Sequence, residues 1–372
     1  MSRKLAIDFG TTNSVIAQWN ADRRETVPLP GISTGMGENH LIPSLLYVRD
    51  GRTGDVMIGA AVQAGGYDCQ HDNRLFRNFK RSIGSSSSSE PRIIDGVQWT
   101  DADAGQHFLR CLLKALPCEV NDIEQLVITV PVALLEGYTV WIRDALKGFP
   151  PERVRIVDES TAAALGYAVT EPGTNVLVID FGGGTFDISL VRLSEFGTSE
   201  KQVSTLSSLL GGERGNIAHV IAKTGASLGG SDIDQWLLAE VLSRTKIPAH
   251  NLGLGYAPLL TACESAKIAL STNKDVEIIV KPESGLERSV TITRAELEGL
   301  MEQHGFYAAL RQLLDRVMGL AHQHGVFKED ISNVLLVGGT SLIPSVQRTL
   351  DTYFRTITHG RQKIRLPSWP AL

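Results

Sequence analysis

The hydrophobic pattern of this chain consists of short apolar runs separated by stretches of helical periodicity, which predicts an α/β protein. Strands are expected at residues 4–7, 14–19, 45–48, 126–130, 154–157, 176–180, 185–192, 276–280, 288–292 and 334–337. Helices are expected at residues 103–116, 138–146, 160–168 and 345–354, and over most of 231–270. Thr293 and Glu296 have the spacing of a capping box, which marks the start of one more helix.

Two of the expected strands end in the same four residues, Ile-Asp-Phe-Gly. The first lies in the segment LAIDFGTTNS and turns directly into another strand, so the segment forms a hairpin. The second lies in VLVIDFGGGTFD and repeats this arrangement after about half the chain. The repeat predicts two similar lobes that face each other across a cleft.

Composition narrows the class of protein further. The 372 residues are 42% hydrophobic and 21% charged, and the net charge of −5 gives no reason to expect nucleic acid or a membrane surface as the main partner. No apolar run approaches the roughly 18 residues of a membrane span, and the first residues do not form a signal peptide. The cysteines have neither metal-site nor disulfide spacing, and they fit a reducing compartment, so we expect a cytoplasmic protein. These cysteines are Cys69, Cys111, Cys118 and Cys263.

The two glycine turns suit a triphosphate. Phosphate oxygens need backbone N–H donors at short range, and glycine allows that close approach. Asp8 and Asp180 come just before the glycines and would repel phosphate unless a cation intervened. Hydrated Mg²⁺ resolves this conflict, so both acids are candidates to hold it through water. The candidate phosphate-binding residues are Gly10, Thr11, Thr12, Asn13, Gly182, Gly183, Gly184 and Thr185.

A single strand–Asp-x-Gly turn is most often only a turn, and neither segment is a P-loop or a Rossmann fingerprint. Two further glycine pairs make a nucleotide site more plausible than a pair of simple turns. Gly229 and Gly230 precede an expected helix, and Gly338 and Gly339 follow an apolar strand. Such pairs let a base and a ribose approach the backbone. Four glycine segments in this order favour a nucleotide site.

The chain resembles the nucleotide-binding domain of the seventy-kilodalton heat-shock chaperones, the DnaK type. The resemblance runs in order over nearly the whole chain, and GGGTFD, DESTAAALGYA and ACESAKIALS favour this family over actin or the sugar kinases. It implies an α/β, actin-like ATPase fold, ribonuclease H-like, with two duplicated lobes around a central nucleotide cleft. Lobe I would cover residues 1–173, with a shortened peripheral part at about 40–125, and lobe II residues 174–372, with a helical peripheral part at about 229–305. The segments that carry the resemblance are IDFGTTNS, VITVPVAL, VRIVDESTAAALGYAV, IDFGGGTFDIS, SLGGSDID, TACESAKIALS, ITRAELE and LLVGGTSLIP.

The resemblance also implies ATP or ADP, Mg²⁺ and K⁺ as cofactors. Lys80 matches a lysine that helps to place the attacking water, and Thr185 matches a threonine near the γ-phosphate. Asp8 shares the catalytic cluster, and Glu159, Asp180 and Asp187 match acids around the water and the cations. A plainer reading of Glu159 is an acid favoured at a helix N-terminus, and a plainer reading of Lys267 is a lysine on a solvated helix face. Residues matched to adenosine contacts are Glu264, Lys267, Ser271, Gly338 and Gly339, and those of the third glycine segment are Gly229 and Gly230.

Several positions depart from the family pattern. Ile268 and Leu342 stand where two arginines usually sandwich the adenine, so an apolar clamp would lose a cation–π attraction of roughly 0.5–2 kcal/mol per arginine. We therefore expect weaker or less selective binding of the base. Ser231 stands at the position of an acid. Ser160 and Thr139 replace a proline and an arginine that relay nucleotide state between domains, which predicts altered interdomain coupling.

Three segments look unlike the family. Between Gly84 and Leu126 we expect only a serine run at 85–89 and one helix. Residues 194–217 read as a polar insertion in a hairpin connection. The tail at 361–372 shows no clear element, and the closing strand and helix of the family are not found after Phe354. The chain is thus interpreted as either a fragment or a reduced relative.

The leading hypothesis is a slow Mg²⁺-dependent ATPase that releases ADP and phosphate. One alternative is a nucleotide-binding interaction module with little turnover, and another is a filament-forming actin-like ATPase. A sugar or acetate kinase is least favoured because no acceptor-site signature is visible. By resemblance, the partners are a J-domain co-chaperone and a nucleotide exchange factor, with a client peptide only if a further domain exists.

Overall fold

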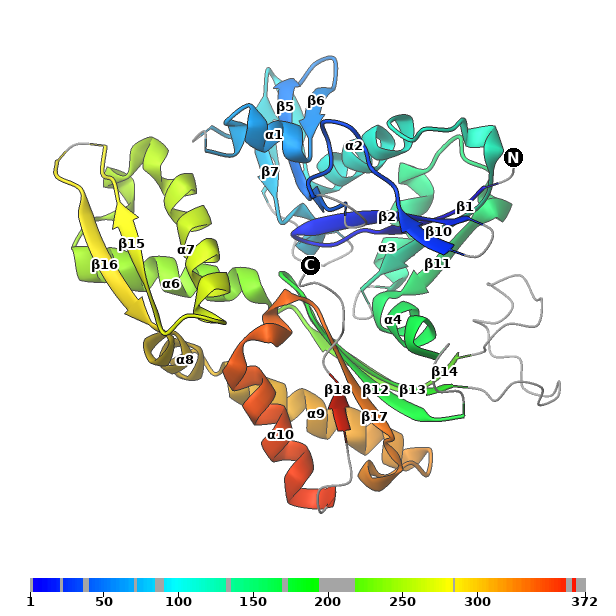
Figure 1. The fold of residues 1–372 in the computed structure, drawn as a ribbon. Helices are drawn as coiled ribbons and strands as arrows, with labels where there is room; N and C mark the ends of the chain where they lie inside the picture. Colours follow the sequence, from blue (N-terminus) through cyan, green and yellow to red (C-terminus); the bar gives the residue numbers. More distant parts are fainter. Residues whose placement is uncertain are drawn as a thin grey trace.

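The computed structural model describes residues 3–20, 23–35, 40–69, 72–83, 90–131, 135–168, 173–193, 218–283, 285–358 and 363–365. Within these ranges the protein is mixed α/β, and its two main sheets lie on opposite sides of helix α4 (Glu159–Ala168; Figure 1). Over the same ranges we find no helix that combines the length and the apolar character needed to cross a bilayer.

The first sheet has the strand order β11-β10-β1-β2-β3. Its central strand β1 pairs antiparallel with β2 and parallel with β10, so Ile7 meets Ile16 on one side and Ile128 on the other. The helices that follow in the chain are α2 (Asp101–Lys114) and α3 (Leu135–Ala145). The strands are β1 (Arg3–Asp8), β2 (Asn13–Asn20), β3 (Arg23–Thr26), β10 (Ile123–Val130) and β11 (Val154–Asp158), with β4 (Ile42–Pro43) added to β2.

The second sheet repeats this topology. Its order is β14-β13-β12-β17-β18, and β12 pairs antiparallel with β13 and parallel with β17, as β1 does with β2 and β10. Helices α9 (Phe306–Gln323) and α10 (Pro344–Thr358) occupy the chain positions of α2 and α3. The internal repeat predicted from the two Ile-Asp-Phe-Gly segments is therefore present in the strand order. The strands are β12 (Asn175–Phe181), β13 (Phe186–Leu193), β14 (Ala218–Ala226), β17 (Asn333–Val337) and β18 (Lys363–Arg365).

Each main sheet carries a smaller peripheral group of elements. On the first side these are a β6-β5-β7 sheet and a β8–β9 hairpin, and on the second side a β15–β16 hairpin with three helices (Figure 1). The domain boundaries expected from the sequence stay predictions. The peripheral elements are β5 (Leu45–Asp50), β6 (Asp55–Ile58), α1 (Ala60–Ala64), β7 (Leu75–Arg77), β8 (Arg92–Ile94), β9 (Val97–Trp99), α6 (Gly230–Thr245), α7 (Tyr256–Leu270), β15 (Asp275–Val280), β16 (Arg288–Thr293) and α8 (Arg294–Gln303).

Two large hydrophobic cores underlie the two sheets, and the phenylalanine of each Ile-Asp-Phe-Gly segment belongs to one of them. Phe9 packs on Phe108 of α2, with ring centroids 5.9 Å apart. Phe181 packs on Phe306 of α9, with centroids 5.0 Å apart. Each core thus fixes the end of the strand that leads into a glycine turn.

Two expectations about irregular segments are wrong. The chain between Gly84 and Leu126 contains the β8–β9 hairpin in addition to a helix, and the tail contains strand β18, which pairs in parallel with β17. These strands have three residues each, too few for an apolar alternation to show in the sequence. The predicted serine loop at 85–89, the insertion at 194–217 and the rest of the tail lie outside the described residues.

Candidate functional site

The β1–β2 turn and the β12–β13 turn approach each other directly. A Cβ added to Gly183 would lie 2.2 Å from the Thr12 hydroxyl oxygen, and one added to Gly184 would lie 2.6 Å from that of Thr11. The backbone of Gly10 is equally constrained, because its Cβ would lie 1.9 Å from the carbonyl oxygen of Asn13. Gly10 is fixed by its own backbone turn, and side chains at Gly183 and Gly184 would displace the two threonine hydroxyls.

The third glycine segment, at the start of α6, is bonded to the second turn. The N–H groups of Gly230 and Ser231 donate to the carbonyl oxygens of Gly182 and Gly183 at 3.0 and 2.8 Å. A Cβ on Gly229 would stand 2.5 Å from the carbonyl oxygen of Gly183. The N-terminus of α6 therefore lies against the Gly182–Gly184 backbone.

The fourth segment closes the group from β17. Thr340 donates its hydroxyl to the carbonyl oxygen of Gly182 at 3.1 Å. Gly338 has a φ of 81°, and a Cβ there would lie 2.3 Å from the carbonyl oxygen of Phe181. The four glycine segments singled out in the sequence are thus brought together in space; Gly339 begins the 3₁₀ turn Gly339–Leu342 that follows.

Five charged residues predicted for catalysis or cation binding lie around these turns, at strand ends, at the start of α4 and on the 3₁₀ turn Phe79–Arg81. Asp8 ends β1 and accepts a hydrogen bond from the Thr129 hydroxyl at 2.6 Å. Asp180 of β12 lies directly opposite Asp187 of β13 in the strand register. The Lys80 ammonium is 4% exposed and donates to Glu159, the first residue of α4. Thr185 closes the second turn, where its carbonyl oxygen accepts from the Gly182 N–H at 3.1 Å.

Burial and the closeness of the charges shift the pKa values of two of these acids. The pKa of Asp180 is raised well above its ordinary value by desolvation and by the negative charges of Glu159, Asp187 and Asp8. Desolvation also raises the pKa of Glu159, although the ammonium of Lys80 opposes this rise. One lysine therefore faces several carboxylates that repel one another.

This excess of negative charge fits a hard cation. No group of three or more His, Cys, Asp or Glu side chains within the described ranges is placed to hold a metal ion directly. Carboxylates that reach an ion through water are compatible with Mg²⁺, which keeps several of its own waters and takes its remaining ligands from phosphate. The carboxylates of Asp8, Asp180 and Asp187 therefore fit a hydrated Mg²⁺ that they would contact through water.

Lys267, which the resemblance matches to an adenosine contact, is bonded to other groups of the protein. Lys267 of α7 donates from its buried ammonium to the carbonyl oxygen of Gly230 and to Asp234 of α6, both at 3.0 Å. Desolvation raises the pKa of Asp234 to about 6, against the attraction of Lys267. Asp234 was missed in the sequence, where its only mark is a second acid four residues after Gly230.

The predicted base clamp is open to solvent on one side. Ile268 is 62% exposed, whereas Leu342 is half-buried. Glu264 and Ser271 are also half-buried on or next to α7. Glu264, Ile268 and Ser271 lie on or next to α7, and Leu342 lies in the 3₁₀ turn after β17. No hydrogen bond among the described residues joins their side chains to one another, in contrast to the backbone bonds between the glycine segments.

The sequence also did not reveal the contacts that join the turn carrying Lys80 to the start of helix α6. Arg81, next to Lys80, forms an ion pair of 3.0 Å with Asp232 of α6, and Ser231 bonds to Asn78 at 3.4 Å. Asp232 also accepts from the N–H of Gly229 at 2.8 Å, which caps α6. The basic pair Lys80-Arg81 was the only local signal for this contact.

The two positions expected to alter the relay lie on α3 and α4, which are consecutive helices in the chain. Ser160 in the first turn of α4 is fully buried, and its hydroxyl finds no hydrogen-bond partner among the residues that the structure describes. Thr139 is half-buried on α3. Neither side chain can replace the rigid ring of proline or the charge of arginine.

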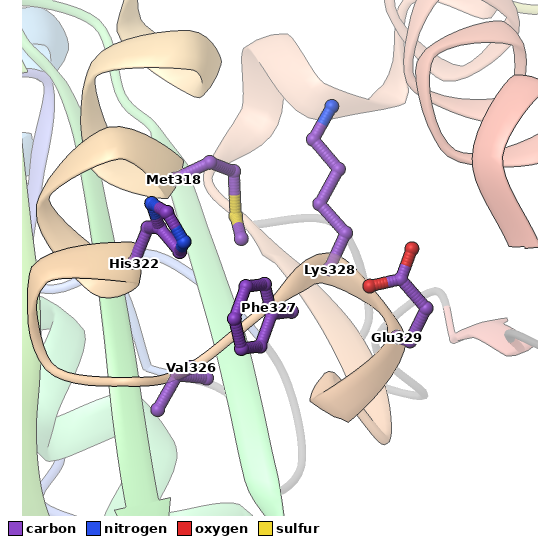
Figure 2. A pocket seen from close by; sticks show the side chains of 6 residues that line it. All are labelled: Met318, His322, Val326, Phe327, Lys328 and Glu329. Atoms are coloured by element: carbon purple, nitrogen blue, oxygen red, sulfur yellow. The ribbon is translucent and has the colours of Figure 1, made fainter.

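A pocket of about 190 Å³ lies elsewhere, between the end of α9 and the 3₁₀ turn Lys328–Asp330 (Figure 2). It shares no residue with the predicted nucleotide site. Its lining side chains are Met318, His322, Val326, Phe327, Lys328 and Glu329.

Comparison with known proteins matches residues 108–361 to a protein-family model described as Hsp70 protein. The matched range is well over half of the chain and includes Glu159, Asp180, the Gly182–Gly184 turn and Lys267. Asp8, the first glycine turn and Lys80 precede it, and their place in the site rests on the geometry described above.

Proposed function

Because the chain belongs to the Hsp70 protein family, whose members are ATPases, we propose that it binds ATP or ADP with Mg²⁺ between its two glycine turns and hydrolyses ATP slowly to ADP and phosphate. The family implies an actin-like ATPase fold, and the repeated strand order of the two sheets supports that assignment.

The observation that carries this proposal is the cluster of Asp8, Glu159 and Asp187 around Asp180, in which the buried Lys80 ammonium pairs with Glu159. Like charges at this density are unfavourable in the protein alone. A bound cation and a substrate that needs one would relieve the repulsion. Phosphoryl transfer depends on such positioning and charge neutralisation.

Each residue would have one task. The backbone N–H groups of the glycine turns hold phosphate oxygens, and the Thr11, Thr12 and Thr185 hydroxyls add donors. Lys80, held by Glu159, positions the attacking water against the terminal phosphate. Asp8, Asp180 and Asp187 hold hydrated Mg²⁺, or K⁺, through water. When bound, Mg²⁺ supplies positive charge that offsets the charge of the phosphates.

The base end of the site would bind weakly. An exposed isoleucine at 268 and a half-buried leucine at 342 offer dispersion without a cation–π contact. Two of the three ammonium protons of Lys267 are already directed to Gly230 and Asp234, so Lys267 holds the start of α6 and has one donor left for a ribose.

The cellular role would be chaperone-like, with a J-domain co-chaperone and an exchange factor as the partner classes. Ser160 and Thr139 would weaken the coupling between nucleotide state and any further domain. A cytoplasmic location would fit this role.

A second candidate function is a nucleotide-binding interaction module with little turnover. The exposed Ile268 and the substituted relay positions Ser160 and Thr139 favour it, because they depart from the pattern of the family's ATPases. The buried Lys80–Glu159 pair opposes it, since a binding module has no need of a positioned lysine.

Single-turnover ATP hydrolysis with Mg²⁺ and K⁺ distinguishes the two functions. The Asp180→Asn and Lys80→Ala variants should lose roughly tenfold or more in hydrolysis rate, because each removes a group that acts on the transferring phosphate. Lys147→Ala is the matched control, since its side chain is 75% exposed beside Asp144. If ATP binds but the unchanged protein hydrolyses it no faster than the two variants, the binding module is the correct function.

A further inference from the structure

We propose that Tyr138 is a positioning residue for Lys80 and holds the turn on which the proposed catalytic lysine stands. This inference rests on the proposed ATPase function. Tyr138 lies on α3 and is 0% exposed, and its hydroxyl donates to the backbone carbonyl oxygen of Lys80 at 2.6 Å. The contact joins two segments 58 residues apart.

The turn that carries Lys80 is short. It is the three-residue 3₁₀ turn Phe79–Arg81, and it begins at Asn78 with a φ of 56°. Within the described residues, the Lys80 carbonyl also accepts from the N–H of Ile83 at 3.3 Å, and the N–H of Ser82 is directed to it as well. The bond from Tyr138 is shorter and comes from outside the turn, so it ties this carbonyl to α3. Desolvation also raises the Tyr138 pKa, so the buried hydroxyl keeps its proton.

Aromatic contacts fix Tyr138 itself. Its ring meets Trp141 edge-on at 5.6 Å, and Trp141 stacks on Phe9 at 5.8 Å with an angle of 12° between the rings. The Lys80 ammonium lies 5.7 Å from the centre of the same Phe9 ring. Both the backbone and the side chain of Lys80 thus rest on one aromatic cluster that α3 shares with the first glycine turn.

This arrangement connects the surface of α3 to the site. Thr139 and Val140 follow Tyr138 on the helix, and Val140 is 64% exposed. A displacement of α3 would move the Tyr138 hydroxyl and with it the Lys80 carbonyl. Helix α3 has Thr139 where the family has an arginine, but it contacts the catalytic turn through the hydrogen bond from Tyr138 to the Lys80 carbonyl.

The first test removes only the hydroxyl. Tyr138→Phe should lower the single-turnover hydrolysis rate about fivefold to tenfold, as expected for a misplaced catalytic group that loses one buried hydrogen bond, while the Kd for Mg²⁺-ATP changes less than about twofold. The matched control is Tyr307→Phe, because Tyr307 is also buried and donates to Ser345 at 2.6 Å in the other core. Equal losses of rate in the two variants, or an unchanged rate in Tyr138→Phe, would overturn the proposal.

A second test does not depend on turnover. The rate at which acetic anhydride modifies Lys80 without nucleotide is followed by peptide mass spectrometry, with exposed Lys147 as the internal reference. We expect faster modification of Lys80 in Tyr138→Phe and no change in Tyr307→Phe. If Lys80 reacts equally in all three proteins, the positioning role is excluded. If Lys80 reacts faster but no protein hydrolyses ATP, the positioning role stands and the ATPase function fails.

Discussion

Asp234 and Lys267 form a buried ion pair between α6 and α7, next to the proposed ribose site. Their nearest charged atoms are 2.8 Å apart, and the two residues are 6% and 8% exposed. A buried pair gains little net stability because both ions lose water, but the loss of one partner leaves the other charge uncompensated. The pair therefore matters chiefly because it holds Lys267 against Gly230 at the start of α6.

The raised pKa of Asp234 predicts a pH dependence of stability. Its pKa is about 6 in the folded chain and near the ordinary value of 3.8 when unfolded, so the folded state binds the proton more tightly. The stability that this provides is present at low pH and is lost as the pH rises through about 6. Relative to Asp234→Asn, the unchanged protein should lose roughly 2 kcal/mol of unfolding free energy between about pH 4 and about pH 7. Urea denaturation of both proteins at each pH measures this difference.

Asp144→Asn serves as the control for that measurement, because the Asp144 carboxylate is 53% exposed. Its difference from the unchanged protein should stay flat over the same range. A flat difference for Asp234→Asn as well would show that Lys267 holds Asp234 ionised throughout.

At the scale of elements, the 3₁₀ turn Phe79–Arg81 carries two cations that serve opposite sides of the molecule. Successive side chains of a 3₁₀ turn are spread about 120° apart, so neighbours face different directions. Lys80 pairs with Glu159 of α4, whereas Arg81 pairs with Asp232 of α6. The turn thus joins the catalytic acids to the helix whose N-terminus lies against the second glycine turn.

Removal of the Arg81 contact should speed nucleotide release. The ion pair is about one quarter exposed at each end, so it contributes on the order of 1 kcal/mol, or about a fivefold change in rate. Stopped-flow release of a fluorescent ATP analogue should therefore be about fivefold faster in Arg81→Ala. High salt should accelerate release from the unchanged protein more than from the variant.

Arg348→Ala is the matched control, because Arg348 pairs with Glu298 away from the glycine turns and is 60% exposed. Its release rate should equal that of the unchanged protein. If Arg81→Ala also releases nucleotide at that rate, the link between the turn and α6 does not limit release.

Elements with long apolar runs could be predicted from the sequence, whereas the shortest strands could not. Strands β10 and β12 are buried along most of their length, so their residues form continuous apolar runs. The β8–β9 hairpin has only three residues on each side, but its Asp95-Gly96 turn, with φ values of 53° and 81°, was a readable signal that the sequence reasoning did not use. Strand β18 left no such signal, because its place depends on β17, some thirty residues earlier.

The same distinction explains which site residues could be found. The glycine turns are local, since close approach and positive φ mark them within a few residues. Asp234, Arg81 and Tyr138 act through partners 33, 151 and 58 residues away, and no periodicity reports such contacts. The resemblance supplied Lys80 and Glu159 but not what holds them.

Within the part of the chain that the structure describes, the two large hydrophobic cores are separate clusters. One core lies around β1 and α2 and the other around β12 and α9. Between the sheets, α4 places Ala163 and Ala164 against Val176 and Val178 in a small apolar cluster. The contacts that join the lobes near the glycine turns include the polar Arg81–Asp232 and Ser231–Asn78 pairs, whereas most apolar packing lies within each core.

This division predicts that nucleotide changes how cooperatively the protein unfolds. Without nucleotide, the two cores should melt in separate steps, so the ratio of calorimetric to van't Hoff enthalpy should be about 2. Mg²⁺-ATP held by the turns of both lobes should bring the ratio toward about 1 and, at a hundredfold excess over Kd, add about 2.7 kcal/mol of stability. Differential scanning calorimetry measures both quantities, and ATP with a metal chelator should change neither. A ratio near 1 without ligand would mean that α4 already couples the lobes, and a ligand-independent melting profile would argue against a nucleotide site shared between them.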